Sequence, residues 1–223
     1  MNYLLGVVGF FLSSHCSCLY IDLTYSLSNS NSYFPTETRF NFTETTALWT
    51  NDSYFYSSNT FKTSEHMGTH LDAPYHFSNV SWKTDQIPIE RLMSIASLII
   101  DVSIQCKQNK SYEVTIDDIK KYEPINLKKY FVILFYTGWT RYWSNQTAYA
   151  GPSYKDNSSN GLEFPGVKDE TADYLVNKYN QTLVGVGIDT LSNRCTRIPD
   201  DEYWTLLTVV TLASTNSSAN NPE

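Results

Sequence analysis

Short apolar runs that alternate with helical patterns constrain the fold of this 223-residue chain most strongly. The segments at residues 97–103 and 130–136 are continuous apolar runs, as in strands that are covered on both faces. A third strand is expected at residues 183–189. One helix is expected to start after Thr115 and another to cover residues 168–178. Strands that alternate with helices predict the α/β class.

Finer details of the pattern place the ends and faces of these elements. Asp118 stands three residues after Thr115, so Thr115 is expected to be the N-cap of a short capped helix. The residues expected on the inner face of the second helix are Ala172, Leu175 and Val176. A first strand is expected at residues 19–26, and a short strand piece at residues 69–72.

Nothing in the sequence divides the chain into several folded units. It contains no internal repeat and no long linker, so we expect one compact domain over residues 19–213. The polar stretch at residues 214–223 is expected to be a disordered tail.

The N-terminal residues are typical of a secretory signal. The apolar run from Leu4 to Leu12 precedes small and polar residues, which predicts a signal peptide at residues 1–18. The chain also carries eight Asn-x-Ser/Thr sequons, which favour a secreted, extracellular glycoprotein, although an Asn- and Ser-rich chain also produces sequons by chance. The sequon residues are Asn41, Asn51, Asn79, Asn109, Asn145, Asn157, Asn180 and Asn216.

Charge and cysteine content exclude several classes of function. A net charge of −7 without a basic cluster argues against nucleic acid as a partner. No apolar run reaches the length of a membrane span, and no nucleotide or flavin fingerprint is present. Beyond the signal, the cysteines are Cys106 and Cys195, which either form one disulfide or remain two buried thiols.

Three of the four histidines fall within eleven residues, together with one aspartate. They are His66, His70, Asp72 and His76, and imidazole and carboxylate groups are the usual ligands of Zn²⁺ and Mn²⁺. On a helix, Asp72 would lie about 200° around from His70. On a straight strand, the first and last histidines would stand about 33 Å apart. The segment must therefore bend to form a site.

Gly68 and Pro74 supply the means for that bend, because glycine relaxes the backbone and proline interrupts a strand ladder. Three protein ligands would leave an open coordination position, which is the catalytic and not the structural arrangement. A water molecule there would become a nucleophile near neutral pH, and a further histidine could accept its proton. The alternative is a group of ordinary hydrogen-bonded histidines.

The segment His66-x-Gly-Thr-His70-x-Asp72-x-Pro74-x-His76-Phe77 closely resembles the signature of the putative cyclase family of metal-dependent hydrolases. That family includes bacterial-type kynurenine formamidases (arylformamidases) and isatin hydrolase. Residues 136–140 (Tyr-Thr-Gly-Trp-Thr), 164–167 (Phe-Pro-Gly-Val) and 186–192 (Val-Gly-Ile-Asp-Thr-Leu-Ser) resemble other segments of the family. The resemblance extends from about residue 19 to residue 193.

This resemblance implies a function and a role for each site residue. His66, His70 and Asp72 would bind Zn²⁺ or Mn²⁺, and His76 would accept the proton of the attacking water. The reaction would be hydrolysis of a linear or cyclic amide, typified by N-formylkynurenine to kynurenine and formate in tryptophan catabolism. Phe34 would be an aromatic wall of the substrate site, the alternative being an ordinary core phenylalanine. The fold would be of the swivelling β/β/α type, in a homo-oligomer.

The resemblance ends before the C-terminal part of the family, which supplies a further histidine and a glutamate. Tyr203 stands where that histidine is expected, and the C-terminal strands are shortened. The acidic run at residues 200–202 is either an oxygen ligand or a solvated turn. Three hypotheses follow: a secreted amide hydrolase, a non-catalytic glycoprotein that uses the same scaffold as a binding module, and a structural zinc site.

Overall fold

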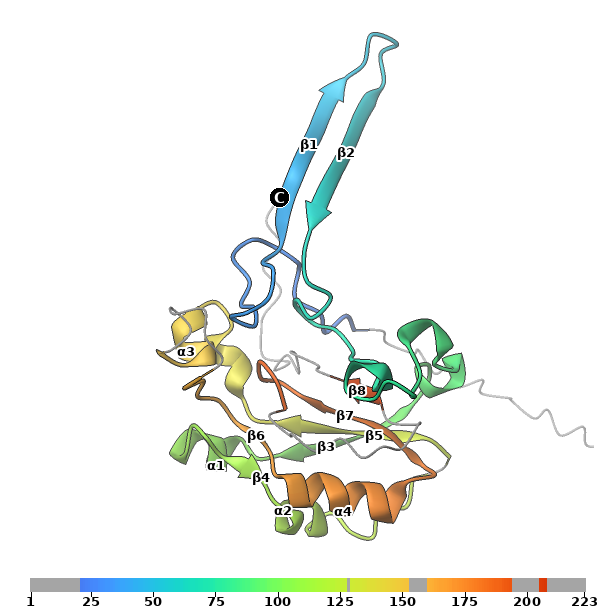
Figure 1. Cartoon of the computed structure of the whole chain (residues 1–223), viewed down its shortest axis with the longest axis vertical. Coiled ribbons are helices and arrows are strands. Elements are labelled where there is room, and N and C mark those ends of the chain that lie inside the picture. The colour runs from blue at the N-terminus through green and yellow to red at the C-terminus, as the bar shows by residue number, and fades with distance from the viewer. Residues whose placement is uncertain (1–20, 128, 153–159, 194–204, 208–223) are drawn as a thin grey trace, which may run out of the picture.

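A computed structural model describes residues 21–127, 129–152, 160–193 and 205–207 of the chain. Its centre is a four-stranded parallel sheet in the order β3-β5-β7-β8 (Figure 1). The strands are β3 Ala96–Asp101, β5 Phe131–Tyr136, β7 Leu183–Ile188 and β8 Thr205–Leu207. The strands expected near residues 97, 130 and 183 are therefore confirmed, and so is the α/β class.

Three helices cover the lower face of the sheet in Figure 1. They are α1 Ser103–Gln108, α2 Ile116–Lys120 and α4 Asp169–Tyr179, accompanied by a short parallel pair of strands, β4 Glu113–Val114 and β6 Gly166–Val167. The core between sheet and helices is apolar, and its fully buried side chains include Ile100, Ile133, Phe135 and Leu175. The two helices expected from the sequence are confirmed.

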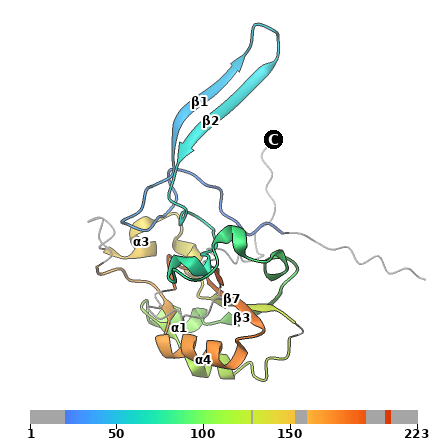
Figure 2. The same cartoon turned by 45° about the vertical axis from the view of Figure 1, so that its right-hand side comes forward.

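Short helices and irregular segments lie on the other side of the sheet (Figures 1 and 2). The short helices are η1 Pro74–His76, η2 Thr84–Gln86, η3 Ile89–Arg91, η4 Trp139–Tyr142 and α3 Gln146–Ala150. A second apolar cluster, separate from the main core, contains the aromatic residues Trp139, Trp143, Tyr149 and Phe164. None of the helices in the described part of the chain is long and apolar enough to cross a membrane.

The inner face of α4 differs by one residue from the sequence prediction. Leu175 and Val176 are buried as expected, but Thr171 is fully buried and Ala172 is only half-buried. The Thr171 hydroxyl donates a hydrogen bond to the Val114 carbonyl at 2.9 Å. This bond gives the buried hydroxyl a partner and fixes the rotation of α4 about its axis relative to β4. Apolar periodicity alone does not reveal such a contact.

The predicted cap of α2 is confirmed, and it belongs to a larger network around Asp118. Thr115 donates to the Asp118 carboxylate from its amide at 3.0 Å and from its hydroxyl at 2.8 Å. The Tyr112 hydroxyl and the Lys121 ammonium donate to the same carboxylate, at 2.6 and 2.8 Å. Burial alone would raise the pKa of Asp118, but these hydrogen bonds, that from Lys121 first, lower that pKa to about 2.

Asp118→Ala should therefore lower the free energy of unfolding by about 2 kcal/mol at pH 7. Because the folded-state pKa lies below the ordinary value of 3.8, this stabilisation is present above about pH 4 and is lost as the pH falls toward 2. Urea unfolding at pH 7 and pH 3 measures both effects. Asp117→Ala is the control, since this neighbouring carboxylate is exposed. Equal losses in the two variants would contradict the prediction.

The prediction of a first strand at residues 19–26 is wrong for the part that the structure describes, because residues 21–28 form no regular secondary structure. Side chains replace the partners that a neighbouring strand would provide. The Thr24 amide donates to Asp22 at 2.9 Å, and the Tyr25 amide donates to the Thr69 hydroxyl at 3.3 Å. The Tyr25 ring stacks on Trp143 with centroids 4.6 Å apart, so packing holds this segment in place.

A long β-hairpin, for which the sequence reasoning predicted no element, projects away from the body (Figures 1 and 2). It consists of β1 Asn41–Trp49 and β2 Phe55–Lys62, paired antiparallel with an irregularity between Phe42 and Glu44. We call residues 41–62 the arm. The loop before the arm carries Phe34, and the loop after it carries the histidine segment.

Several expectations concern residues outside the described part of the chain, namely the signal peptide, Cys195, Tyr203, the acidic run at 200–202 and the tail. Cys106 is a buried free thiol, and burial raises its pKa to about 12, so it is unreactive at neutral pH. The sequon asparagines that the structure describes are all exposed, as glycosylation requires: Asn41, Asn51, Asn79, Asn109, Asn145 and Asn180.

Candidate metal centre

The histidine segment bends as its composition predicts. Gly68 has a positive φ of +74°, a backbone angle that favours glycine. Pro74 begins the short helix η1, which ends at His76. The strand piece predicted at residues 69–72 is wrong, because within these residues only Asp72 forms an isolated bridge.

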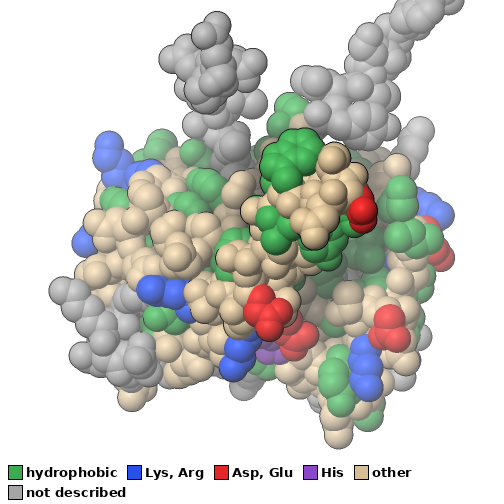
Figure 3. Space-filling view, turned by 90° about the horizontal axis from the view of Figure 1, so that it is seen from above, with side chains coloured by type: hydrophobic (Ala, Val, Ile, Leu, Met, Phe, Trp, Pro, Cys, Tyr) green, Lys and Arg blue, Asp and Glu red, His purple; other side chains and the backbone are tan. Residues whose placement is uncertain are grey.

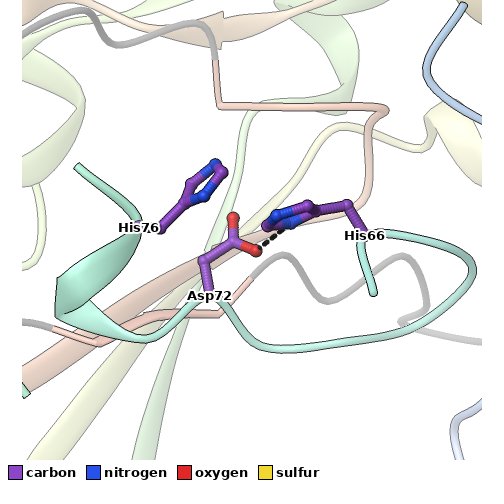
Figure 4. A group of neighbouring side chains, drawn as sticks. All are labelled: His66, Asp72 and His76. Atoms are coloured by element: carbon purple, nitrogen blue, oxygen red, sulfur yellow. Dashed lines mark hydrogen bonds and ion pairs between the residues drawn. The ribbon is translucent and has the colours of Figure 1, made fainter. Parts of the chain in front are cut away.

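This bend brings His66, Asp72 and His76 together (Figure 4), and His70 also approaches the Asp72 carboxylate. His66 Nδ1 lies 2.7 Å from Asp72 Oδ1, and His70 Nε2 lies 3.2 Å from the same oxygen. The rings of His66 and His76 have centroids 4.1 Å apart. Ligand atoms from His66, Asp72 and His76 all lie within 4.8 Å of one another, close enough to share one ion.

The surroundings of His70 also fit a metal ligand. Its Nδ1 lies 2.8 Å from the Gly68 carbonyl oxygen, and since that oxygen only accepts, Nδ1 carries a proton. In the neutral ring, Nε2 then directs a lone pair at Asp72 Oδ1, which is also an acceptor. Such a pair is favourable only with a proton or a cation between the two atoms. Metal-binding histidines commonly donate their second N–H to a backbone carbonyl.

The charges of the group are matched to this arrangement. Burial would raise the pKa of Asp72, but the hydrogen bond from His70 and the charges of the three histidines outweigh it and lower that pKa. Burial would lower the pKa of His70, yet the bonds to Asp72 and Gly68 raise it. For His76, burial dominates over attraction to Asp72, and its pKa is lowered. At neutral pH, Asp72 is therefore ionised and the His76 imidazole is neutral.

These residues line a pocket of about 270 Å³ on the face seen from above in Figure 3, where histidine surface lies beside acidic side chains. Phe34, the predicted aromatic wall, is among the lining residues; its role stays a prediction. The lining residues that sequence reasoning did not assign are Glu37, Phe77, Leu191, Ser192 and Asn193.

Two signals in the sequence point to these missed residues. Phe77 directly follows His76, so it shares the geometry of the ligand segment. Residues 191–193 follow β7, and the carboxyl ends of parallel strands are where α/β folds place their sites. No such signal marks Glu37, whose carboxylate accepts a hydrogen bond from the Ser64 hydroxyl at 2.7 Å.

The sequence profile of the putative cyclase family matches residues 21–193, most of the chain. The chain belongs to this family. No curated protein sequence matches it. Among solved structures, isatin hydrolase A from Ralstonia solanacearum is similar, with a TM-score of 0.68 and 22% identity over 84% of this chain and 77% of that chain.

Two further structures share the fold of this cyclase-family chain. An isatin hydrolase bound to the product analogue thioisatinate has a TM-score of 0.71 and 19% identity, over 86% of this chain and 79% of that one. A structure described as a potential metal-dependent hydrolase with cyclase activity has a TM-score of 0.54 and 17% identity, over 83% and 78%. At these identities, the likeness is one of fold.

Proposed function

We propose that this chain is a metal-dependent hydrolase of linear or cyclic amides, resembling arylformamidase, with N-formylkynurenine as the model substrate in tryptophan catabolism. The observation that carries the proposal is the convergence of two imidazole nitrogens on one buried Asp72 oxygen, beside the neutral imidazole of His76. Family membership and the isatin hydrolase fold support it, because isatin contains a cyclic amide.

His66, His70 and Asp72 would hold the ion, Zn²⁺ or Mn²⁺, since their donor atoms suit both. When bound, the ion supplies Lewis acidity at the substrate carbonyl and lowers the pKa of the attacking water. His76 accepts the water proton at a ring nitrogen as the oxygen adds to the carbonyl carbon. The same imidazole then returns the proton to the amine nitrogen as the C–N bond breaks, so protons balance over the cycle.

The apolar side chains of the pocket would position the substrate. Phe34, Phe77 and Leu191 line the pocket together with the ligand group, and aromatic rings pack favourably against a substrate ring. We further propose that the fold is of the swivelling type and that the chain is a secreted glycoprotein working as a homo-oligomer. The exposure of the six described sequon asparagines is consistent with that location.

The decisive experiment measures metal content and turnover on the same purified chain. We expect about one ion per chain by mass spectrometry, lost in His70→Ala, and hydrolysis of N-formylkynurenine that a chelator abolishes. His76→Ala should retain the ion but lose turnover. Full activity after chelation or in His76→Ala would overturn the proposal. A chain that holds the ion and cleaves neither N-formylkynurenine nor isatin would instead favour the binding-module hypothesis.

The pH dependence of turnover tests the role of His76 separately. Because a base acts only when unprotonated and burial lowers the pKa of His76, kcat/KM should be constant at neutral pH and fall only below the ordinary value of 6.5. A cation bound beside His76 also lowers the pKa of its imidazole, so it moves the acid limb of the profile to lower pH as well. A pH–rate profile with N-formylkynurenine measures it, and an acid limb centred above 6.5 would contradict the assignment.

A further inference from the structure

Glu37 is a charged residue of the candidate pocket that the proposed hydrolysis does not use. The other titratable residues among the described lining residues form the ligand group and the base, and they are His66, His70, Asp72 and His76. Both acidic and basic side chains border the histidine surface in Figure 3, but no lysine or arginine is among the described residues that line the pocket itself. The pocket therefore offers a further carboxylate beside the predicted metal centre.

A tight turn places Glu37 beside the predicted aromatic wall. The Glu37 amide donates to the Phe34 carbonyl at 2.8 Å, which closes a turn of four residues. Pro35 occupies the second position of this turn, where the fixed φ of proline is favourable. Phe34 and Glu37 stand at the two ends of the turn, and both line the pocket. One short segment thus brings an aromatic residue and an acidic residue to the same space.

Hydrogen bonds through Ser64 hold the Glu37 carboxylate close to the histidine segment. The Ser64 hydroxyl donates to Glu37 Oε2 at 2.7 Å, and the same hydroxyl oxygen accepts a hydrogen bond from the His66 amide at 3.2 Å. One hydroxyl group therefore separates the carboxylate from the backbone of a predicted metal ligand. Among the described residues, Ser64 is the one side-chain partner of this carboxylate, and it occupies Oε2, which leaves Oε1 open to a ligand.

The nearest cationic residue along the chain does not neutralise Glu37. Arg39 donates from Nη2 to the Gln146 side chain at 3.2 Å, and its guanidinium carbon lies 4.8 Å from the centroid of the Tyr33 ring. A carboxylate without a fixed counter-ion attracts a cationic group of a ligand. The two phenylalanines that line the pocket add to this attraction, because a cation also binds favourably over an aromatic ring.

We propose that Glu37 binds a positively charged ammonium group of the substrate and so selects aromatic amides that carry one. This inference rests on the proposed function, because the amide is cleaved at the ligand group of the same pocket. A substrate with a carboxylate in place of the ammonium group meets repulsion from Glu37 and finds no cationic partner among the described lining residues. N-formylkynurenine carries both groups, so its turnover does not reveal this preference.

Three aromatic formamides that differ only at the end of the side chain test the proposal on the metal-loaded chain. They are N-formylkynuramine, which ends in an ammonium group, its analogue with a carboxylate at that end, and its analogue with a methyl group there. For the unmodified chain, kcat/KM should be about tenfold higher for the ammonium compound than for the methyl compound, and lowest for the carboxylate. In Glu37→Gln, which keeps an acceptor for Ser64, this preference should fall to within about twofold.

The matched control is Glu65→Gln. The Glu65 carboxylate lies 3.9 Å from His66 Nε2, but its side chain is 91% exposed and Glu65 is not among the described residues that line the pocket. This variant should therefore keep the preference of the unmodified chain for the ammonium compound.

Equal kcat/KM values for the ammonium and methyl compounds overturn the proposal, and so does a preference that survives Glu37→Gln. If the chain cleaves none of the three compounds, the proposed function fails, and equilibrium binding then decides this inference. In a nuclear magnetic resonance titration, kynuramine should bind about tenfold more tightly than its methyl analogue, and Glu37→Gln should remove the difference. Equal dissociation constants of the two compounds for the unmodified chain overturn the proposal.

Discussion

Asp72→Asn should abolish binding of the ion and lower kcat/KM by at least about 1,000-fold, or about 4 kcal/mol of transition-state stabilisation. Both His66 and His70 direct a ring nitrogen at Asp72 Oδ1, at 2.7 and 3.2 Å, so this oxygen lies at the centre of the donor group. Asparagine keeps the shape of the side chain but removes its charge. An amide group at this position also offers a donor where an ion needs a lone pair.

A neighbouring carboxylate provides the matched control. Glu65 Oε1 lies 3.9 Å from His66 Nε2, but the Glu65 side chain is 91% exposed, so solvent screens its charge. Glu65→Gln should leave ion content unchanged and kcat/KM within about threefold of the unmodified chain. Ion content per chain and turnover of N-formylkynurenine are measured on both variants. Asp72→Asn with a full complement of ion would remove Asp72 from the ligand set.

The histidine segment shows what the sequence alone could predict about the site. The residue types and the glycine and proline among them predicted a bent segment that gathers four donors, and the structure brings all four together. The opposite wall of the pocket could not be predicted in this way. It comes from residues 191–193, which reach the site only because β7 lies in the middle of a parallel sheet.

The secondary-structure elements also fall into two groups, those that the sequence predicts and those that it does not. Strands and helices that bury a continuous or periodic apolar pattern, such as β5 and α4, were predictable because burial imposes the pattern. The arm was missed because both of its faces are exposed, so no inside–outside contrast marks its strands. Residues 21–26 were misassigned because amides among them find side-chain acceptors, such as Asp22, in place of a neighbouring strand.

Asp189→Ala should cause the largest loss of stability, about 3–5 kcal/mol in the free energy of unfolding. Asp189 is 1% exposed and follows the end of β7. Its carboxylate accepts hydrogen bonds from the Thr137 amide at 2.7 Å, the Thr137 hydroxyl at 2.5 Å and the Trp139 amide at 3.1 Å. Alanine removes the acceptor of the two Thr137 donors, each of which costs about 1–3 kcal/mol when unsatisfied, and leaves the Trp139 amide only the Thr137 hydroxyl, at 3.1 Å.

The matched control is Asp101→Ala, at the end of strand β3 in the same sheet. Asp101 also accepts a backbone hydrogen bond, from the Ser103 amide at 2.9 Å, but it is exposed, so water replaces the lost acceptor. Its loss should stay below about 1 kcal/mol. Urea unfolding at pH 7 compares the two variants, and equal losses would show that burial of Asp189 does not set the effect.

Asp189 also links two of the separate segments that resemble the family. Residues 136–140 and 186–192 are distant in sequence, yet the hydrogen bonds from Thr137 and Trp139 to Asp189 join the loop after β5 to the end of β7. The same loop after β7 continues into Leu191, Ser192 and Asn193, which line the pocket. Asp189→Ala should therefore also raise KM for N-formylkynurenine in the fraction that remains folded, whereas Asp101→Ala should leave KM unchanged.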